Sequence, residues 1–231
     1  MEEFTHEIKH IAIIMDGNRR WAKEKKLPTM VGHKKGVEAL KKTVIACEKF
    51  GVKYLTVYAF STENWNRTQE EVDFLMNLLA QTIAGELLEL HKNNVVLNFI
   101  GDLEALNQDL QKTLKNAHEK TKNNTGVNLQ VAINYGGRDE IKNAIKKIVA
   151  SGISEEEITE ELISKNLYKG EIPDPDLVIR TGNEKRISNF LLWQIAYSEL
   201  YVTDIFWPDF DENELKKAIE EFNLRTRRFG E

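Results

Sequence analysis

Short apolar runs alternate with long amphipathic stretches along the chain, and this alternation constrains the fold more than any other feature. The apolar runs, rich in β-branched residues and expected to be strands, lie at 10–15, 53–60, 95–100, 128–134, 176–180 and 202–206. The amphipathic stretches, expected to be helices, lie at 33–50, 69–92, 103–124, 138–150, 154–166, 187–200 and 211–228. Because the runs are apolar on both faces, they predict an α/β fold with an open parallel sheet covered by helices. With no repeat or linker in the sequence, we expect a single domain over residues 1–231.

The charge balance excludes a general polyanion-binding surface, so any recognition of phosphate groups has to be local. The chain carries 32 Lys plus Arg against 37 Asp plus Glu, a formal net charge of −5, and we expect no nucleic-acid partner. One cysteine, Cys47, excludes an intramolecular disulfide and fits a reducing compartment. No apolar run approaches the roughly 20 residues needed to cross a bilayer, and the N-terminus has no signal-peptide pattern. These features predict a cytoplasmic protein.

Arginine is concentrated in the segments that follow the predicted strands. Six of the nine arginines lie in these segments or at the last residue of a predicted strand: Arg19, Arg20, Arg67, Arg138, Arg180 and Arg186. In an open parallel sheet, ligands bind beyond the carboxyl ends of the strands. The planar guanidinium group pairs with phosphate through two hydrogen bonds. A single arginine at such a place more often caps a helix or pairs with an acid, but six of them favour phosphate recognition.

The segment after the first strand carries the first candidate site. Asp16 is well placed to hold Mg²⁺ together with a substrate phosphate, because Mg²⁺ usually takes one or two carboxylates plus phosphate oxygens. Gly17 lets the backbone approach an anion closely, and Arg20 supplies charge. An Asp-Gly-Asn sequence also makes ordinary turns. The P-loop and dinucleotide glycine motifs are missing, so neither kind of nucleotide binding has support, and no Cys/His cluster has zinc-ligand spacing.

A second constellation follows the second strand. It consists of two neutral polar residues, Ser61 and Asn64, beside the cation Arg67. Such a set can orient a diphosphate and help to remove a proton from an uncharged carbon acid. Trp65 lies among them, and its individual pattern favours burial in the core.

A third constellation follows the fifth strand. Arg180 and Arg186 flank a loop that leads into Ser188, at the expected start of a helix. A helix N-terminus with a serine and two arginines is a good anion site. Since this site is distinct from the first, we expect the molecule to hold two phosphorylated ligands, which favours a transferase over a hydrolase.

Together these motifs resemble those of the cis-prenyltransferases, the undecaprenyl diphosphate synthase family of Z-isoprenyl diphosphate synthases. From about residue 10 onwards the matching segments are HIAIIMDGNRRWAK with Gly32-His33, YAFSTENWNR, INYGGRDEI, DPDLVIRTG and RISNFLLWQIAYSELYVTDIFWPDF. The resemblance implies a six-stranded, largely parallel sheet surrounded by helices, and a homodimer. It also implies Mg²⁺-dependent condensation of isopentenyl diphosphate with an allylic diphosphate such as farnesyl diphosphate. The product would be a long-chain cis-polyprenyl diphosphate such as undecaprenyl diphosphate, a lipid carrier for cell-wall or glycan synthesis, released through a peripheral membrane contact.

The resemblance also implies roles for individual residues. Asp16 would bind Mg²⁺ and assist diphosphate departure, while Asn64 would act with Ser61 and His33 in proton removal. Glu199 would be a second Mg²⁺-related carboxylate. In one straight helix Glu199 would lie about 16 Å from Ser188, so a bend or a dimer partner would be needed. The implied substrate-binding residues are Gly17, Asn18, Arg19, Arg20, Trp21, His33, Ser61, Thr62, Glu63, Trp65, Arg67, Arg180, Arg186, Ile187 and Ser188.

Some positions depart from the family pattern. Thr29 replaces an arginine that commonly helps to hold the allylic diphosphate, and Arg19, where bacterial members usually have glycine, is hypothesised to compensate. Thr68 replaces a proline but makes a sound helix N-cap. Asn183 replaces a glycine, and asparagine tolerates positive φ better than most residues. The tail around Arg228 resembles an Arg-x-Gly ending, which implies a reach across the dimer interface.

The growing product of such an enzyme needs an apolar tunnel. The expected helix at 69–92 carries an apolar stripe at Val72, Leu75, Leu79, Ile83, Leu87 and Leu90. Such a stripe is by itself typical of ordinary core. The resemblance favours a tunnel wall for this helix and for 103–124, with Ala80 and Ala84 leaving room for product.

One alternative comes from a different functional class. A non-catalytic partner subunit with the same fold would bind a lipid diphosphate without turnover. Such a subunit is expected to lose Asp16 or Asn64, and this chain retains both.

Overall fold

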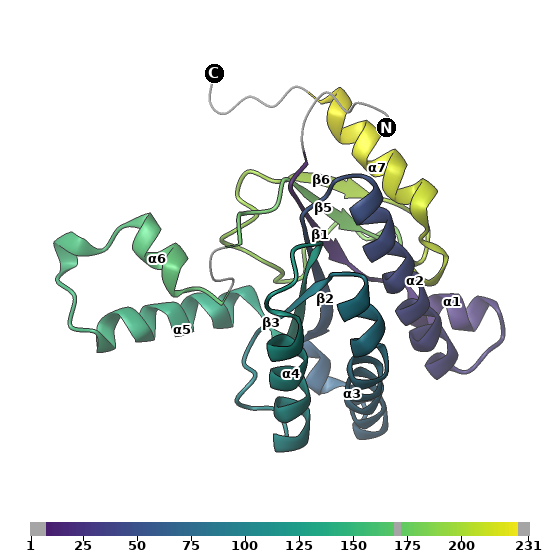
Figure 1. The fold of residues 1–231 in the computed structure, drawn as a ribbon, viewed down its shortest axis with the longest axis horizontal. Helices are drawn as coiled ribbons and strands as arrows, with labels where there is room; N and C mark the ends of the chain where they lie inside the picture. Colours follow the sequence, from purple (N-terminus) through teal and green to yellow (C-terminus); the bar gives the residue numbers. More distant parts are fainter. Residues whose placement is uncertain (1–7, 169–171, 226–231) are drawn as a thin grey trace.

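The computed structural model describes residues 8–168 and 172–225 (Figure 1). The strands are β1 (His10–Ile14), β2 (Tyr54–Ser61), β3 (Val96–Ile100), β4 (Asn128–Tyr135), β5 (Leu177–Arg180) and β6 (Glu199–Val202). The α-helices are α1 (Asn18–Glu24), α2 (Thr29–Lys49), α3 (Gln69–Lys92), α4 (Gln108–Thr121), α5 (Gly137–Ala150), α6 (Glu160–Asn166) and α7 (Glu212–Leu224). Short 3₁₀ turns are η1 (Thr62–Asn66), η2 (Glu155–Glu157) and η3 (Trp207–Asp209).

One six-stranded sheet organises the molecule, as the sequence predicts. The strand order is β3-β4-β2-β1-β5-β6, and every neighbouring pair is parallel. β1 therefore lies between β2 and β5, so the segments that follow these three strands leave the same edge side by side. The central strand is entirely buried, as expected for a parallel sheet covered on both faces.

Alternate residues of the strands belong to two separate hydrophobic clusters. Ile11 and Ile13 of β1 belong to the larger cluster, which includes apolar residues of α2, α3, α4 and α7. Ala12 and Ile14 belong to the smaller cluster on the other face, with Phe190 from the segment before β6. Figure 1 shows α2, α3 and α4 gathered on one side, while α5 and α6 project away on the other. The two faces of the sheet are thus covered very differently.

The expected helix at 187–200 is wrong. This segment forms turns, and the last strand begins at Glu199 rather than at 202. Ser188, Asn189 and Leu191 have φ values of 48°, 63° and 46°, which a right-handed helix does not allow. The apolar spacing instead reflects turns that pack Leu191 and its apolar neighbours against the second face of the sheet.

The expected helix at 69–92 forms with these bounds as α3, and the other expected helices form with shifted ends. The stretch 103–124 contracts to α4, which begins after an Asn107 cap that accepts a hydrogen bond from Leu110 N at 2.9 Å. The stretch 154–166 divides into η2 and α6, and Ser154 and Glu157 form a reciprocal capping box in η2. α2 begins earlier than expected, after Pro28. Helix α1 is an element that the sequence patterns did not predict.

The one cysteine, Cys47 on α2, is fully buried, and burial raises the pKa of its thiol to about 12.

Across residues 8–168 and 172–225, no helix combines the length and apolar character that crossing a bilayer requires.

Candidate active site

Asp16 follows β1 at the carboxyl edge of the sheet and lies between two arginines. Arg180 Nη2 donates a hydrogen bond to Oδ2 at 2.8 Å, and Arg20 Nη2 lies 3.1 Å from Oδ1. Thr181 Oγ1 donates to the Asp16 main-chain oxygen at 2.6 Å. Burial raises the pKa of Asp16, but Arg180 and then Arg20 lower it further, so the pKa lies below its ordinary value. The carboxylate is therefore ionised at neutral pH.

Gly17 provides the tight turn from β1 into α1. Its φ is +111°, and a Cβ at this position would lie 2.7 Å from Phe206 Cδ1. Only glycine combines this backbone conformation with so close an approach. The turn places Asn18, Arg19 and Arg20 directly beyond the strand end, and it buries Trp21 of α1.

Arg20 joins the end of β1 to the loop after β5. Its Nη1 donates to Gly182 O at 2.7 Å and lies 3.6 Å from Glu184 Oε1. The guanidinium group also lies over the Phe206 ring, 5.2 Å from its centre. Asn183 in this loop has φ 59°, which confirms that the loop uses the tolerance of asparagine for positive φ. The first and third predicted constellations therefore adjoin one another.

The third constellation forms, although the predicted helix that would begin near Ser188 does not. It brings together Arg180, Arg186 and Ser188. Arg180 is buried, and its Nη1 donates to Ser188 Oγ at 2.7 Å and to the main-chain oxygen of Arg186. Its Nε is buried without a partner among the residues described. The exposed Arg186 pairs with Glu184 at 2.5 Å, and Ile187 is half-buried beside it. Because Ser188 lies in a turn, any anion here meets side chains rather than a helix N-terminus.

The segment after β2 is held in place by a reciprocal cap. Asn64 Oδ1 accepts from Ser61 N at 3.1 Å, and the Ser61 side chain accepts from the Asn64 backbone. Glu63 Oε1 accepts from Asn189 Nδ2 at 2.9 Å, which ties η1, beginning at Thr62, to the loop after β5. The second and third constellations are therefore also adjacent.

The sequence-based prediction that Trp65 is buried in the core is wrong. It is 44% exposed and meets Phe60 edge to face, with 5.2 Å between ring centres. Its Nε1 donates to Asn134 Oδ1 at 2.7 Å. This bond to β4 orients the indole at the rim of the site.

Glu71 is a site residue that the sequence analysis missed. Its carboxylate lies 2.8 Å from Arg67 Nη1, 3.6 Å from Arg19 Nη1 and 3.9 Å from His33 Nε2. The side chain is only 15% exposed. Thr68 caps α3 by accepting from Glu71 N at 3.4 Å, but the Glu71 side chain turns to Arg67, Arg19 and the imidazole of His33 instead of completing a capping box. The i, i+4 spacing of Arg67 and Glu71 was the signal that could have revealed the pair.

His33 is buried and uncharged at neutral pH. Burial, followed by the nearby Arg67, lowers the pKa of the imidazole to about 4, although Glu71 acts in the opposite direction. Its Nε2 is buried and makes no hydrogen bond to the residues described. His33 would therefore contact a diphosphate or a reacting proton as a hydrogen-bonding group, and not as a cation.

Two polar hollows meet at these residues. Both are lined by Asp16, Asn18, His33 and Arg67. The first, of about 750 Å³, also includes Arg19, Arg20, Lys23 and Thr29. The second, of about 580 Å³, also includes Ser61, Asn64, Arg180, Arg186 and Ser188. Each has the size of a small-molecule site, about 300–1,000 Å³, so the predicted pair of ligands would share one wall.

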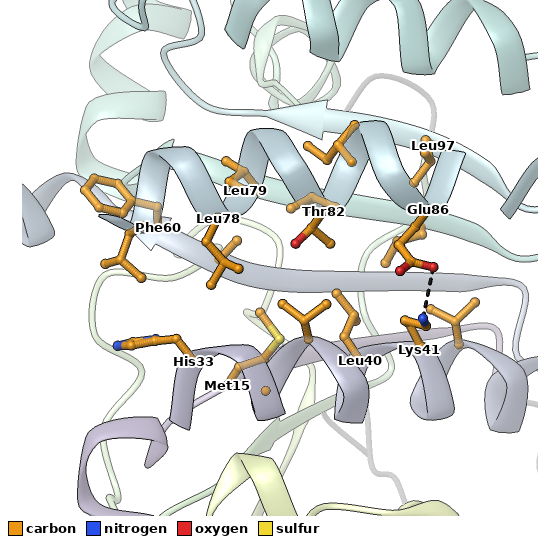
Figure 2. A pocket seen from close by; sticks show the side chains of 18 of the residues that line it. Met15, His33, Leu40, Lys41, Phe60, Leu78, Leu79, Thr82, Glu86 and Leu97 are labelled. Atoms are coloured by element: carbon orange, nitrogen blue, oxygen red, sulfur yellow. Dashed lines mark ion pairs between the residues drawn. The ribbon is translucent and has the colours of Figure 1, made fainter. Parts of the chain in front are cut away.

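An apolar cavity of about 150 Å³ adjoins both hollows through Met15, Asn18 and His33. Figure 2 shows it between α2 and α3, with His33 at one end. The predicted stripe lines it at Leu75, Leu79, Ile83 and Leu90. The second helical wall is α2, not the expected stretch 103–124, which contributes no lining residue. Ala80 does not line the cavity and Ala84 is exposed, so neither leaves room as expected.

Glu199 does not meet Asp16 within one chain. It is the first residue of β6 and pairs with Leu177, whereas Val202 pairs with Arg180 at the site edge. Three residues of strand separate Glu199 from that edge by about 10 Å. Its carboxylate instead binds Arg225 Nη1 at 2.7 Å. In the part of the chain described, no three His, Cys, Asp or Glu side chains converge on a metal position, and the tail around Arg228 lies outside the described residues.

Comparison with known proteins identifies this arrangement. The sequence model of the undecaprenyl diphosphate synthases matches residues 14–230. The chain belongs to this family. An isoprenyl transferase of Clostridium tetani is 54% identical over 226 residues, covering 96% of this chain and 89% of the relative. One from Neisseria gonorrhoeae is 52% identical over 228 residues, covering 99% and 91%.

Two solved structures share the fold. Lavandulyl diphosphate synthase from Lavandula x intermedia, in complex with dimethylallyl diphosphate, has a TM-score of 0.94 at 36% identity, covering 97% of this chain and 98% of that one. A probable undecaprenyl diphosphate synthase from Campylobacter jejuni has a TM-score of 0.84 at 37% identity, covering 98% and 100%. The chain is therefore a prenyl-transferring enzyme with the six-stranded fold that the sequence predicts.

Proposed function

We propose that this chain condenses isopentenyl diphosphate with an allylic diphosphate such as farnesyl diphosphate. The product is a long-chain cis-polyprenyl diphosphate such as undecaprenyl diphosphate, a lipid carrier for cell-wall or glycan synthesis. The observation that carries the proposal is the junction of two arginine-lined hollows with an apolar cavity at Asn18 and His33. Diphosphate groups suit the hollows, while a hydrocarbon chain suits the cavity.

Each substrate has its own hollow in this proposal. The allylic diphosphate binds beside Arg19 and Arg20, and isopentenyl diphosphate binds at Arg180 and Ser188. The allylic C–O bond breaks and its electron pair leaves with the diphosphate. A C–C bond then forms between the allylic carbon and the terminal alkene carbon, and loss of a proton from the neighbouring methylene restores the double bond. Support for Asn64 and His33 in proton removal comes from the second hollow, which both of them line.

The residues present fit Mg²⁺. Asp16 provides one ionised carboxylate at the junction of the hollows, and Asn18 Oδ1 is buried there without a partner among the residues described. One carboxylate with diphosphate oxygens and water is a common Mg²⁺ environment. Bound there, Mg²⁺ would supply positive charge to the departing diphosphate. Since Glu199 lies at the other end of β6, its contribution would come from a partner subunit.

A homodimer completes the proposal. β6 is an edge strand, and its Leu200 and Val202 are 48% and 37% exposed. An apolar edge strand of this kind is suited to being covered. The cytoplasmic location and a peripheral membrane contact for product release stay predictions from the sequence and from the resemblance.

The test is incorporation of labelled isopentenyl diphosphate onto farnesyl diphosphate with and without Mg²⁺. We expect Mg²⁺-dependent products, and Asp16→Ala should lower turnover at least about 100-fold, because removing one group that stabilises transition-state charge costs about that much. Asp16→Asn is the matched variant, since its amide keeps a hydrogen bond to Arg180 but loses the charge. Both should keep the circular-dichroism spectrum of the parent.

The outcomes separate the two candidate functions. Wild-type turnover that survives in both Asp16 variants would refute the role of this carboxylate. Binding of farnesyl diphosphate without incorporation, for every allylic primer tried, would instead favour a non-catalytic partner subunit.

A further inference from the structure

An ion pair crosses the apolar cavity at a distance from the diphosphate site. Lys41 Nζ, on α2, lies 2.9 Å from Glu86 Oε2, on α3. Both residues line the cavity, although their neighbours on the same helix faces are mainly apolar. Figure 2 shows the pair at the opposite end from His33. Lys41 is eight residues after His33 on α2, about 12 Å along the helix axis.

The cavity continues past this pair. Val44 and Leu90, each about one turn further along α2 and α3, are also lining residues. A hydrocarbon chain that grows away from His33 therefore has to pass the charged groups of Lys41 and Glu86. Methylene groups that displace water from these charges meet a desolvation cost.

The width of the cavity depends on how α2 and α3 are held together. Among the described residues, the ion pairs that join these helices are Lys41–Glu86 and the 3.9 Å contact of His33 with Glu71. Because His33 is neutral at pH 7, Lys41–Glu86 is the charged tie. An apolar cavity of about 150 Å³ accepts a molecule the size of benzene. A longer chain needs more room than this, and separation of α2 from α3 to provide it would stretch this ion pair.

We propose that the Lys41–Glu86 ion pair is a latch between α2 and α3 that limits how far the product chain extends. The pair is thus a determinant of product length. This inference rests on the proposed function for its biological meaning, while the latch itself is a property of the cavity. The pair is partly exposed, 39% and 26% for the two side chains, so its loss should affect overall stability little and leave folded variants to test.

Charge reversal tests the latch. Lys41→Glu and Glu86→Lys each place like charges across the cavity, so the main product should lengthen by at least one isoprene unit. The double variant Lys41→Glu/Glu86→Lys restores attraction and should restore the parental product length. Reversal of the Lys35–Glu38 pair is the matched control, because that 2.8 Å pair lies on α2 but does not line the cavity.

A second readout needs no turnover. Straight-chain alcohols of increasing length are titrated into the same variants, and the longest chain that still gains affinity is recorded. This limit should move to longer chains in both single variants and return in the double variant. If the limit moves but no variant makes polyprenyl product, the latch stands and the proposed function fails. If product forms but neither product length nor the alcohol limit responds, the latch is wrong and the proposed function stands.

Discussion

Asp16 and His33 line the same hollows, but at neutral pH the carboxyl group is ionised and the imidazole is uncharged. Burial disfavours the charged form of both. Arg180 and Arg20 restore the negative charge of Asp16, whereas Arg67 adds to the effect of burial on His33. The same hollows therefore present a carboxylate and a neutral imidazole, a combination suited to binding a cation and moving a proton.

The neutral state of His33 predicts a pH-dependent stability. Its pKa of about 4 in the folded protein lies below the ordinary 6.5, so the unfolded chain binds the proton more tightly. Stability should fall as the pH drops from about 6.5 towards 4, by about 2 kcal/mol from this group at pH 5. Urea unfolding of the parent and of His33→Asn at pH 7 and pH 5 measures this. Equal pH sensitivity of the two proteins would contradict the assignment.

Arg19 offers a test of compensation. Arg19 and Thr29 line the same hollow, which supports the hypothesis that Arg19 replaces the arginine missing at position 29. Arg19→Gly should weaken binding of the allylic diphosphate about tenfold, since a hydrogen bond to a charged group contributes roughly 1.5–3 kcal/mol. Titration with farnesyl diphosphate gives the affinity. A double variant Arg19→Gly/Thr29→Arg should recover it, and unchanged affinity in the single variant would refute compensation.

Individual site residues differ in how far the sequence could predict them. Asp16 and Arg180 were predictable because both lie at the carboxyl ends of strands of one parallel sheet. Glu71 was predictable only in part, because its spacing from Arg67 indicates one pair but its contacts with Arg19 and His33 are tertiary and no local spacing specifies them. The predicted helix at 187–200 includes Glu199, whereas its position on a strand depends on the pairing of β6 with β5.

At the scale of elements, regular hydrophobic patterns were informative where they belonged to strands and long helices. The prediction of a helix at 187–200 failed because apolar side chains that pack on a sheet from successive turns can have the same spacing as those on one face of a helix. Its positive φ values, at Ser188, Asn189 and Leu191, are stabilised by contacts far along the chain. One of these is the hydrogen bond from Arg138 N to Asn189 Oδ1 at 2.9 Å.

The start of α3 is a local element that supports the site. Thr68 caps the helix between Arg67 and Glu71, so Thr68→Ala should cost about 1 kcal/mol of stability and raise the KM for substrate. Thr159→Ala is the matched control, because Thr159 caps α6 by accepting from Leu162 N at 3.2 Å. Thermal unfolding and steady-state kinetics compare the two. The expectation fails if both variants change KM alike or neither loses stability.

At the scale of the whole molecule, the sheet order creates the site. Asp16 and Arg180 are separated by 164 positions, and they meet because β1 and β5 are neighbours. The α-β alternation predicted a parallel sheet, but not the strand order, which depends on how the helices pack. The same order leaves β6 at an edge.

The exposed edge predicts the oligomeric state. A Leu200→Glu/Val202→Glu variant should convert the proposed dimer into a monomer, because it places charge where apolar side chains would be buried. Sedimentation velocity measures the mass. Ile45→Glu is the control, since Ile45 is 57% exposed on α2. A parent protein that sediments as a monomer, or a β6 variant that remains dimeric, would exclude this edge as the interface.

The bond between Asp16 and Arg180 has a thermodynamic consequence for ligand entry. The carboxylate of Asp16 and the guanidinium group of Arg180 already balance one another, so the proposed diphosphate and Mg²⁺ would each bind by displacing one member of this pair from the other. A diphosphate that drew Arg180 away would leave Asp16 paired with Arg20 alone and so more open to a cation, and a cation on Asp16 would leave Arg180 more open to an anion. By linkage, each ligand then raises the affinity of the other by the same factor. Under this proposal, simultaneous binding of the two ligands is favoured over binding of either one alone.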